Sequence, residues 1–476
     1  MNAAAPVPPP AHAPVTTPFA RAHASRTGAP TLRECAAALA SGAATSVSLV
    51  EDALARIAAH RAAGGSAYVG EVDAGAALQA AAASDALRAS GPVPSPLAGL
   101  PVSVKDLFDV QGHVTGAGAR VMADQPPAAA DAPAVARLRA AGAVLLGRTN
   151  MSEFAFSGLG LNPHHGTPAH PADAARITGG STSGGAATVA LGLAAATLGT
   201  DTGGSIRIPA AFCGLTGFKP TARRVPLAGA YPLSRSLDSA GPIARSVDCC
   251  AILDAVLSGE TLDTRAAPLA GLRLGVTGDY VMDDVEPAVA SAFERALDRL
   301  SAAGARIVRF GFPELHRLPQ INAAGGLVAA EAWQLHRARL ADPALEAQYD
   351  PRVAQRIRRG AQISAADYID LLDARARLQA CARERLRDLD AWLMPTVAVR
   401  APLLADVQDD TARFIATNGL VLRNTTVLNF LDGCALSIPC QAPGDLPVGL
   451  SVGGLHGADE RIFQVGRAVE ACLWGA

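Results

Sequence analysis

Residues 178–219 read TGGSTSGGAATVALGLAAATLGTDTGGSIRIPAAFCGLTGFK and hold two glycine-rich loops that each carry a serine. The first loop spans residues 179–185 and the second spans residues 199–205. Glycine is favoured where the backbone turns sharply or approaches a ligand, and exposed N–H groups in such loops form an anion pocket. The small side chains between the loops predict a closely packed, central helix over 184–196, followed by a short strand that ends near Gly199.

Outside this stretch, strand-like and helix-like segments alternate along the chain. Val102 and Val104 alternate with polar residues, which is the two-residue period of a strand. A helix is predicted over 287–300, where a proline occupies the first turn and apolar residues share one face. Further strands are predicted at 143–146, 272–276, 306–310, 392–394, 435–438 and 449–452, and further helices at 31–63, 133–141 and 459–473. The alternation predicts one large α/β domain over residues 31–476, with a mixed, mostly parallel sheet covered by helices on both faces.

The composition argues against several classes of function. The net charge is −2 and aromatic residues make up 4% of the chain, whereas nucleic-acid-binding proteins carry a basic excess and stacking aromatics. The longest apolar stretch, 186–198, has about 13 residues, but a membrane span needs about 20. Residues 1–30 are rich in alanine and proline and lack the pattern of a signal peptide, so we expect a flexible leader. We therefore predict neither direct nucleic-acid binding nor membrane insertion.

The cysteines and histidines do not form a recognisable metal or disulfide pattern. The eight cysteines show no Cys-x-x-Cys pair and no regular spacing, which favours reduced thiols in a cytoplasm. His164, His165 and His170 match no common metal-binding spacing, so we expect a polar loop and no metal. The adjacent Cys249 and Cys250 are expected to be buried, because no nearby positive charge would activate a thiolate.

The residues alone leave three interpretations of the glycine loops. Phosphate binding is disfavoured, because neither loop has the P-loop lysine or the Gly-x-Gly-x-x-Gly pattern of a dinucleotide site. The loops also fit plain structural turns. In the third interpretation a serine is a nucleophile and the glycine N–H groups form an oxyanion hole. Its base could be Lys105, because lysines are scarce in this chain and burial in an apolar strand lowers a lysine pKa; the alternative is a strand-end lysine that reaches solvent.

Four motifs together resemble the amidase signature family, in its stand-alone bacterial branch. They are LAGLPVSVKD at residues 97–106, GRTNMSEF at 147–154, GTDTGGSIRIPA at 199–210 and LPVGL at 446–450. The resemblance extends from about residue 31 to the C-terminus. It implies that Ser205 is the nucleophile, Ser181 the bridging serine and Lys105 the base, and that the Gly180–Ser181 peptide bond is cis.

The same resemblance implies the reaction and the neighbours of the triad. We expect an amidohydrolase that works through a seryl acyl-enzyme on a small-molecule amide, without metal or cofactor. The oxyanion hole would be the backbone N–H groups of Thr202, Gly203, Gly204 and Ser205. The residues assigned to substrate contact are Arg207, Gly180, Thr182 and Trp333. Those assigned to holding the loops are Thr149, Asn150, Glu153 and an ion pair of Arg207 with a nearby carboxylate. The variable segments 231–236, 315–339 and 414–429 are predicted to form the specificity surface.

Two alternatives stay open within the family. One is the glutaminase (A) subunit of a tRNA-dependent amidotransferase, which would need partner proteins to bind tRNA. Ala222 stands where many such relatives carry an aromatic residue, and residues 226–230 look more like stand-alone amidases. The other alternative is an inactive member that acts as a binding protein, which the intact serines and lysine disfavour. The resemblance is compatible with a cytoplasmic homodimer.

Overall fold

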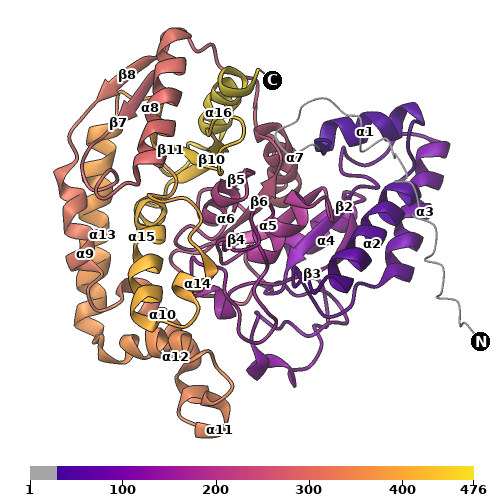
Figure 1. Cartoon of the computed structure of the whole chain (residues 1–476), viewed down its shortest axis with the longest axis horizontal. Coiled ribbons are helices and arrows are strands. Elements are labelled where there is room, and N and C mark those ends of the chain that lie inside the picture. Colours follow the sequence, from indigo (N-terminus) through magenta and orange to yellow (C-terminus); the bar gives the residue numbers. More distant parts are fainter. Residues whose placement is uncertain (1–28, 476) are drawn as a thin grey trace, which may run out of the picture.

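The computed structural model describes residues 29–475, and within that range one eleven-stranded sheet runs through the chain (Figure 1). The strands lie in the order β1-β3-β2-β4-β6-β5-β10-β11-β9-β7-β8. Their bounds are β1 (Tyr68–Val69), β2 (Pro101–Lys105), β3 (Val144–Thr149), β4 (Ala196–Asp201), β5 (Thr216–Lys219), β6 (Ser239–Ala244), β7 (Arg273–Val276), β8 (Arg306–Arg309), β9 (Ala391–Pro395), β10 (Cys434–Pro439) and β11 (Gly449–Gly454). The single sheet confirms the predicted α/β class.

Helices cover both faces of this sheet. Their bounds are α1 (Leu32–Ser41), α2 (Ser46–Ala62), α3 (Ala74–Ser90), α4 (Pro133–Ala140), α5 (Ser183–Ala190), α6 (Arg207–Phe212), α7 (Val247–Ser258), α8 (Pro287–Ala302), α9 (Leu318–Ile321), α10 (Gly326–Leu340), α11 (Pro343–Glu346), α12 (Pro351–Arg358), α13 (Ala365–Leu386), α14 (Leu404–Val407), α15 (Thr411–Phe430) and α16 (Asp459–Trp474). On one face α16 packs on β10 and β11 and contacts α7 and α8, while on the other α5, α6 and α15 form the layer that carries the glycine loops.

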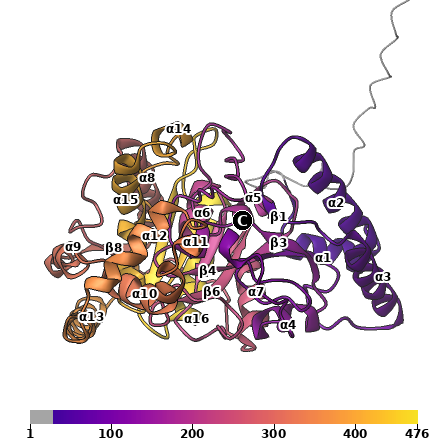
Figure 2. The same cartoon turned by 90° about the horizontal axis from the view of Figure 1, so that it is seen from below.

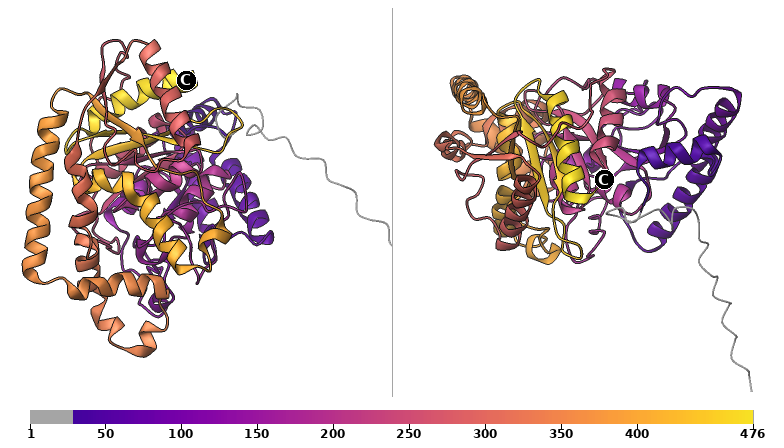
Figure 3. Two further views of the ribbon diagram at one scale, coloured as in Figure 1. Left: turned by 60° about the vertical axis from the view of Figure 1, so that its left-hand side comes forward. Right: turned by 90° about the horizontal axis from the view of Figure 1, so that it is seen from above.

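Helices from the first and the second half of the chain lie at opposite ends of the sheet, whereas the C-terminal helix α16 packs on the interior strands β10 and β11. The N-terminal helices α1–α3, in indigo, stand beside the β1 edge, and the orange helices α10–α13 stand beyond β9, β7 and β8 (Figures 2 and 3). The segment that contains both glycine loops lies between them, at the centre of the molecule (Figure 1). Both halves of the chain can therefore contribute residues to a site near these loops.

The sheet is mixed, as predicted, but parallel pairing is less common than the sequence suggested. Parallel pairs occur where β2 meets β3 and β4, and where β7 meets β8 and β9. The six other pairs among the described strands are antiparallel, including every pair from β4 through β6, β5, β10 and β11 to β9. A parallel pair needs a long crossover connection, whereas β10 and β11 are joined by residues 440–448 alone. The local strand pattern does not contain this information, because it does not tell which strands are neighbours.

Two predicted helices differ in extent from the observed ones. The helix expected over 184–196 ends at Ala190, because Gly192 adopts a left-handed φ of 69° and Leu193 N–H returns to the Thr188 carbonyl. The chain then reaches β4 through a turn and bend over residues 191–195. The helix expected over 31–63 is divided into α1 and α2, with Gly42 in the left-handed conformation that ends α1.

Two further sequence predictions concern the cysteines and the leader. All eight cysteines are free thiols, and Cys249 and Cys250 are buried as expected. Within the described part of the chain, no helix combines the length and the apolar character that crossing a bilayer would require. The predicted leader falls outside the described residues for positions 1–28.

Candidate active site

Lys105 is the last residue of β2, a strand that pairs with β3 on one side and β4 on the other. Its side chain is completely buried. The Nζ atom donates hydrogen bonds to Ser181 Oγ at 2.8 Å and to Thr200 Oγ1 at 2.9 Å. The strand-end lysine thus does not reach solvent, and it contacts one of the two serines singled out in the sequence.

Burial determines the charge of this lysine. Removal from water disfavours the ammonium form and lowers the pKa of Lys105 from 10.5 to about 7, although the charges of Asp201 and Asp238 act in the opposite direction. A substantial fraction of Lys105 is therefore an uncharged amine near neutral pH. Such an amine can accept a proton from the hydroxyl that it contacts.

Ser181 lies in the first glycine loop, directly before α5. The Gly180–Ser181 peptide bond is cis, as the resemblance implied. The Ser181 carbonyl accepts a hydrogen bond from Ser152 N–H at 3.2 Å, and Gly180 N–H donates to the Gly158 carbonyl at 2.8 Å. A side chain on Gly180 would place its Cβ 2.6 Å from the nitrogen of Gly160, so this position requires glycine.

Ser205 lies in the second glycine loop, between β4 and α6. Its carbonyl accepts a hydrogen bond from Thr182 N–H at 3.2 Å, which connects the two loops. The hydroxyls of Ser181 and Ser205 share no hydrogen bond among those of the described residues, and catalytic hydrogen bonds of this kind often form only with substrate bound. Ser205 lines a cavity of about 260 Å³ together with Thr202 and Gly203.

The loop over residues 202–205 has the features expected of an oxyanion hole. In the described structure the N–H groups of Gly203, Gly204 and Ser205 donate to no protein acceptor. The Gly203 carbonyl accepts hydrogen bonds from the hydroxyls of Thr425 and Thr426 on α15, at 2.6 and 3.2 Å. Thr202 Oγ1 donates to Asp238 Oδ1 at 2.5 Å. These contacts fix the loop from both sides and leave its donors free.

Arg207 forms an ion pair that holds the start of α6. Its guanidinium donates two hydrogen bonds to the Asp201 carboxylate, each at 3.0 Å, and one to Asn429 Oδ1 at 2.6 Å. Burial alone would raise the pKa of Asp201, but the charges of Arg207 and Lys219 outweigh it and hold this pKa at about 2. The predicted pairing of Arg207 with a carboxylate is therefore present.

None of the four residues assigned to substrate contact lines the Ser205 cavity. Arg207 is fully buried against Asp201, and Gly180 and Thr182 are buried as well. Trp333 packs against the main core cluster, and α10 presents Val328 to the cavity in its place. The reason is the rotation of α10 about its axis, which is set by its contact with the chain at Gly360. Contrary to the sequence prediction, the structure does not bring these four residues to the cavity.

The walls of the Ser205 cavity come from segments far apart in the sequence. All three predicted specificity segments contribute, through Leu233, Val328 and Leu422 among others. Phe156, Tyr280, Arg356 and Phe430 also line the cavity but lie outside the predicted segments. No local sequence signal identifies these residues. Arg356, for example, lies on α12, whose several arginines have the pattern of a solvent-facing helix.

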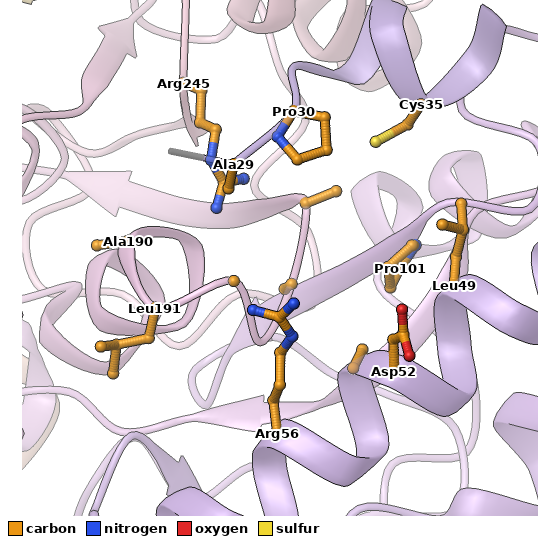
Figure 4. A pocket seen from close by; sticks show the side chains of 14 residues that line it. Ala29, Pro30, Cys35, Leu49, Asp52, Arg56, Pro101, Ala190, Leu191 and Arg245 are labelled. Carbon is orange, nitrogen blue, oxygen red and sulfur yellow. The ribbon is translucent and has the colours of Figure 1, made fainter. Parts of the chain in front are cut away.

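A separate pocket lies at the described beginning of the chain, away from the serines. It measures about 130 Å³ and lies between α2 and the segment that connects α5 to β4. Figure 4 shows Arg56 and Arg245 pointing into it from opposite sides. It contains none of Lys105, Ser181 and Ser205, so the cavity at Ser205 remains the candidate active site.

Comparison with known proteins agrees with this geometry. A family model described as Amidase matches residues 48–463. This chain belongs to the amidase signature family. The amidase is 38% identical to a 2-amino-5-chloromuconic acid deaminase of Comamonas testosteroni, over 84% of this chain and 87% of the relative. It is 34% identical to the A subunit of a glutamyl-tRNA(Gln) amidotransferase from Roseiflexus sp. (strain RS-1), over 92% of this chain and 96% of that relative.

A solved structure described as an amidase has the same fold. It matches with a TM-score of 0.84 and 36% identity, covering 93% of this chain and all of the solved chain. The amidase is therefore a hydrolase that acts on carbon–nitrogen bonds of linear amides.

Proposed function

We propose that this amidase cleaves carboxamides through an acyl-enzyme on Ser205, with Ser181 as the proton relay and Lys105 as the base. One observation carries the proposal: the buried Lys105 amine, with its pKa lowered to about 7, donates to the Ser181 hydroxyl at 2.8 Å. A charged lysine could not accept a proton, so burial is what makes the base functional. Activity is expected to rise as the pH increases through about 7.

In the proposed reaction neutral Lys105 accepts the proton of Ser181 while Ser181 accepts the proton of Ser205. Ser205 Oγ then forms a bond to the amide carbonyl carbon, and the oxyanion accepts hydrogen bonds from the N–H groups of residues 203–205. Ser181 gives its proton to the nitrogen as the carbon–nitrogen bond breaks, and Lys105 returns its proton to Ser181. Water attacks the acyl-enzyme by the same route and releases the carboxylic acid.

The cavity favours substrates that carry a negative charge. Arg356 lines it half-buried, with the Phe156 ring 4.3 Å from its guanidinium carbon and the Phe156 carbonyl as a hydrogen-bond acceptor. Burial, with the nearby charge of Arg359, lowers the pKa of Arg356 to about 10, and no carboxylate of the described residues pairs with it. A substrate carboxylate would supply the missing partner. The name of the Comamonas relative refers to an acid, which supports the same class.

A matched pair of substrates tests this proposal. Ammonia release is measured for the monoamide of a short dicarboxylic acid and for the uncharged aliphatic amide of the same length. Arg356→Met should raise KM for the acidic amide about 10- to 100-fold, the worth of a charge-assisted hydrogen bond, and change KM for the neutral amide less than threefold. Arg352→Met, on the same helix but paired with Asp350 and outside the cavity, is the control. Equal effects on both amides would contradict an anionic substrate.

The glutaminase component of an amidotransferase is the second candidate, favoured by the 34% identity that extends over 92% of this chain. Glutamine belongs in the same substrate panel for this reason. Glutaminase activity that appears only with partner proteins would support this candidate, while turnover of amides by the isolated chain supports the stand-alone hydrolase. An inactive binding protein is tested by the same assay, since it would bind acidic amides without releasing ammonia.

A further inference from the structure

A second cavity adjoins the oxyanion loop on the side of the lysine. It measures about 430 Å³ and shares Ala155, Thr202 and Leu233 with the Ser205 cavity. Thr200, which accepts a hydrogen bond from Lys105, lines it, and so does Asp238. Asp238 thus lies next to both the oxyanion loop and the residue that holds the lysine, and the reaction described above does not use it.

The contacts of Asp238 join two functional segments. Its carboxylate accepts the Thr202 hydroxyl of the oxyanion loop at 2.5 Å and the backbone N–H groups of Leu233 and Ser234 at 3.0 and 3.1 Å. Leu233 belongs to the segment that lines both cavities. One carboxylate therefore holds the oxyanion loop and a wall of the substrate cavity in a fixed relation.

Asp238 differs from Asp201, the other carboxylate whose charge acts on Lys105, in having no cationic partner. Asp201 is paired with Arg207, whereas no ion pair of Asp238 occurs among the described residues. Burial raises the pKa of Asp238 to about 6 although its hydrogen bonds act in the opposite direction, so most of this carboxyl is ionised at neutral pH. The negative charge of Asp238 is therefore not compensated by a paired cation. The electrostatic energy of this charge becomes more favourable when Lys105 takes up a proton.

Other charged groups around Asp238 neither neutralise its charge nor hold Thr202. Glu331 on α10 accepts hydrogen bonds from the hydroxyls of Ser234 and Ser236, and its charge raises the pKa of Asp238 further. Arg223 and Arg235 line the same cavity with exposed side chains. Neither arginine forms an ion pair with Asp238 in the described structure.

We propose that Asp238 is a positioning residue of this amidase: it holds Thr202 of the oxyanion loop and stabilises the ammonium that Lys105 forms when Ser205 attacks. The proposal rests on the triad proposed above. It assigns two separable effects to one carboxylate, an orienting effect through Thr202 and a charge effect on Lys105. Variants that remove one effect at a time can distinguish them.

The test compares the pH dependence of kcat and KM in four variants. Asp238→Asn removes the charge but keeps an acceptor for Thr202, so kcat should fall 10- to 100-fold and the acidic limb of the kcat profile should move to lower pH, because the pKa of Lys105 falls. Asp238→Glu keeps the charge and should keep the limb at its wild-type pH. Thr202→Val breaks only the orienting contact, so kcat should fall without movement of the limb. Glu331→Gln, which removes a neighbouring charge that does not face Lys105, should leave the limb in place.

The outcomes separate this inference from the triad itself. If Asp238→Asn lowers kcat but leaves the acidic limb where it was, the charge effect is refuted and Asp238 is only structural. If Thr202→Val keeps wild-type kcat, the orienting effect is refuted. If Asp238→Asn fails to fold, Asp238→Glu still tests the proposal. Because this variant keeps the charge, a shift of the acidic limb of its kcat profile would count against the proposal. Failure of the triad would show differently, as turnover that persists in Ser205→Ala.

Discussion

Replacement of Lys105 by methionine should abolish turnover and make the fold more stable, by an amount that depends on pH. The pKa of Lys105 falls from 10.5 in the unfolded chain to about 7 in the folded one because the amine is buried. Between these two values the unfolded chain binds more protons, so the free energy of unfolding of the wild type increases with pH. A methionine side chain has similar length and does not titrate, so its variant lacks this slope.

The size of the effect follows from the two pKa values. The buried amine destabilises the wild type by about 4 kcal/mol at pH 7 and by about 2 kcal/mol at pH 9. The stability advantage of Lys105→Met should therefore shrink by about 2 kcal/mol over this interval. The hydrogen bonds lost to Ser181 and Thr200 subtract roughly 1 kcal/mol each at every pH, so they leave the slope unchanged.

Urea unfolding at pH 7, 8 and 9 measures this difference. Ser205→Ala is the control, because it removes the nucleophile without removing a titrating group, and its stability should run parallel to that of the wild type. The chain has only two lysines, Lys105 and Lys219, so selective ¹³C labelling of lysine gives two side-chain NMR signals, one of which Lys105→Met removes. Parallel pH profiles of wild type and Lys105→Met, or a Lys105 signal that titrates near its ordinary pKa, would refute the reasoning.

Four further substitutions test the ion pair, the oxyanion loop and the cavity wall. Asp201→Asn leaves a buried guanidinium without its partner and should cost about 3–5 kcal/mol in urea unfolding; a loss below about 1 kcal/mol would show that the ion pair does not hold the loop. Gly204→Ala introduces a Cβ 2.2 Å from a threonine hydroxyl of α15 at a φ of 136°, so we expect an inactive or insoluble protein, and normal kcat would contradict the geometry. Trp333→Leu should change KM less than threefold, whereas Val328→Phe, on the cavity side of the same helix, should raise KM at least tenfold; the reverse order would restore Trp333 as a substrate contact.

Local sequence patterns predicted the position of one chemically important residue. The alternation around Val102 and Val104 placed Lys105 in a buried strand, and the structure confirms it, since β2 lies between two other strands. The cis peptide bond before Ser181 was expected only from the resemblance to the amidase signature family, and the structure contains it. Residues that depend only on their neighbours in the chain are those that sequence patterns describe best.

The substrate cavity could not be predicted, because it depends on how distant helices are rotated. Trp333 and Val328 lie on the same helix, and only the packing of α10 decides which of them faces the cavity. Arg356 belongs to a helix with many arginines, where a buried cation has the same sequence signature as a solvent-exposed one. Antiparallel pairing at the centre of the sheet was missed for a similar reason, since strand neighbours are set by the whole fold.

Covalent trapping of the acyl group tests the central claim most directly. The amidase is mixed with a good amide substrate, quenched in acid within one turnover, digested and analysed by mass spectrometry. We expect an acyl mass on the peptide that contains Ser205, absent in Ser205→Ala and strongly reduced in Lys105→Met. An acyl group on Ser181 would contradict the assignment of Ser205 as the nucleophile. So would full turnover of the wild type without any adduct, together with activity retained in Ser205→Ala.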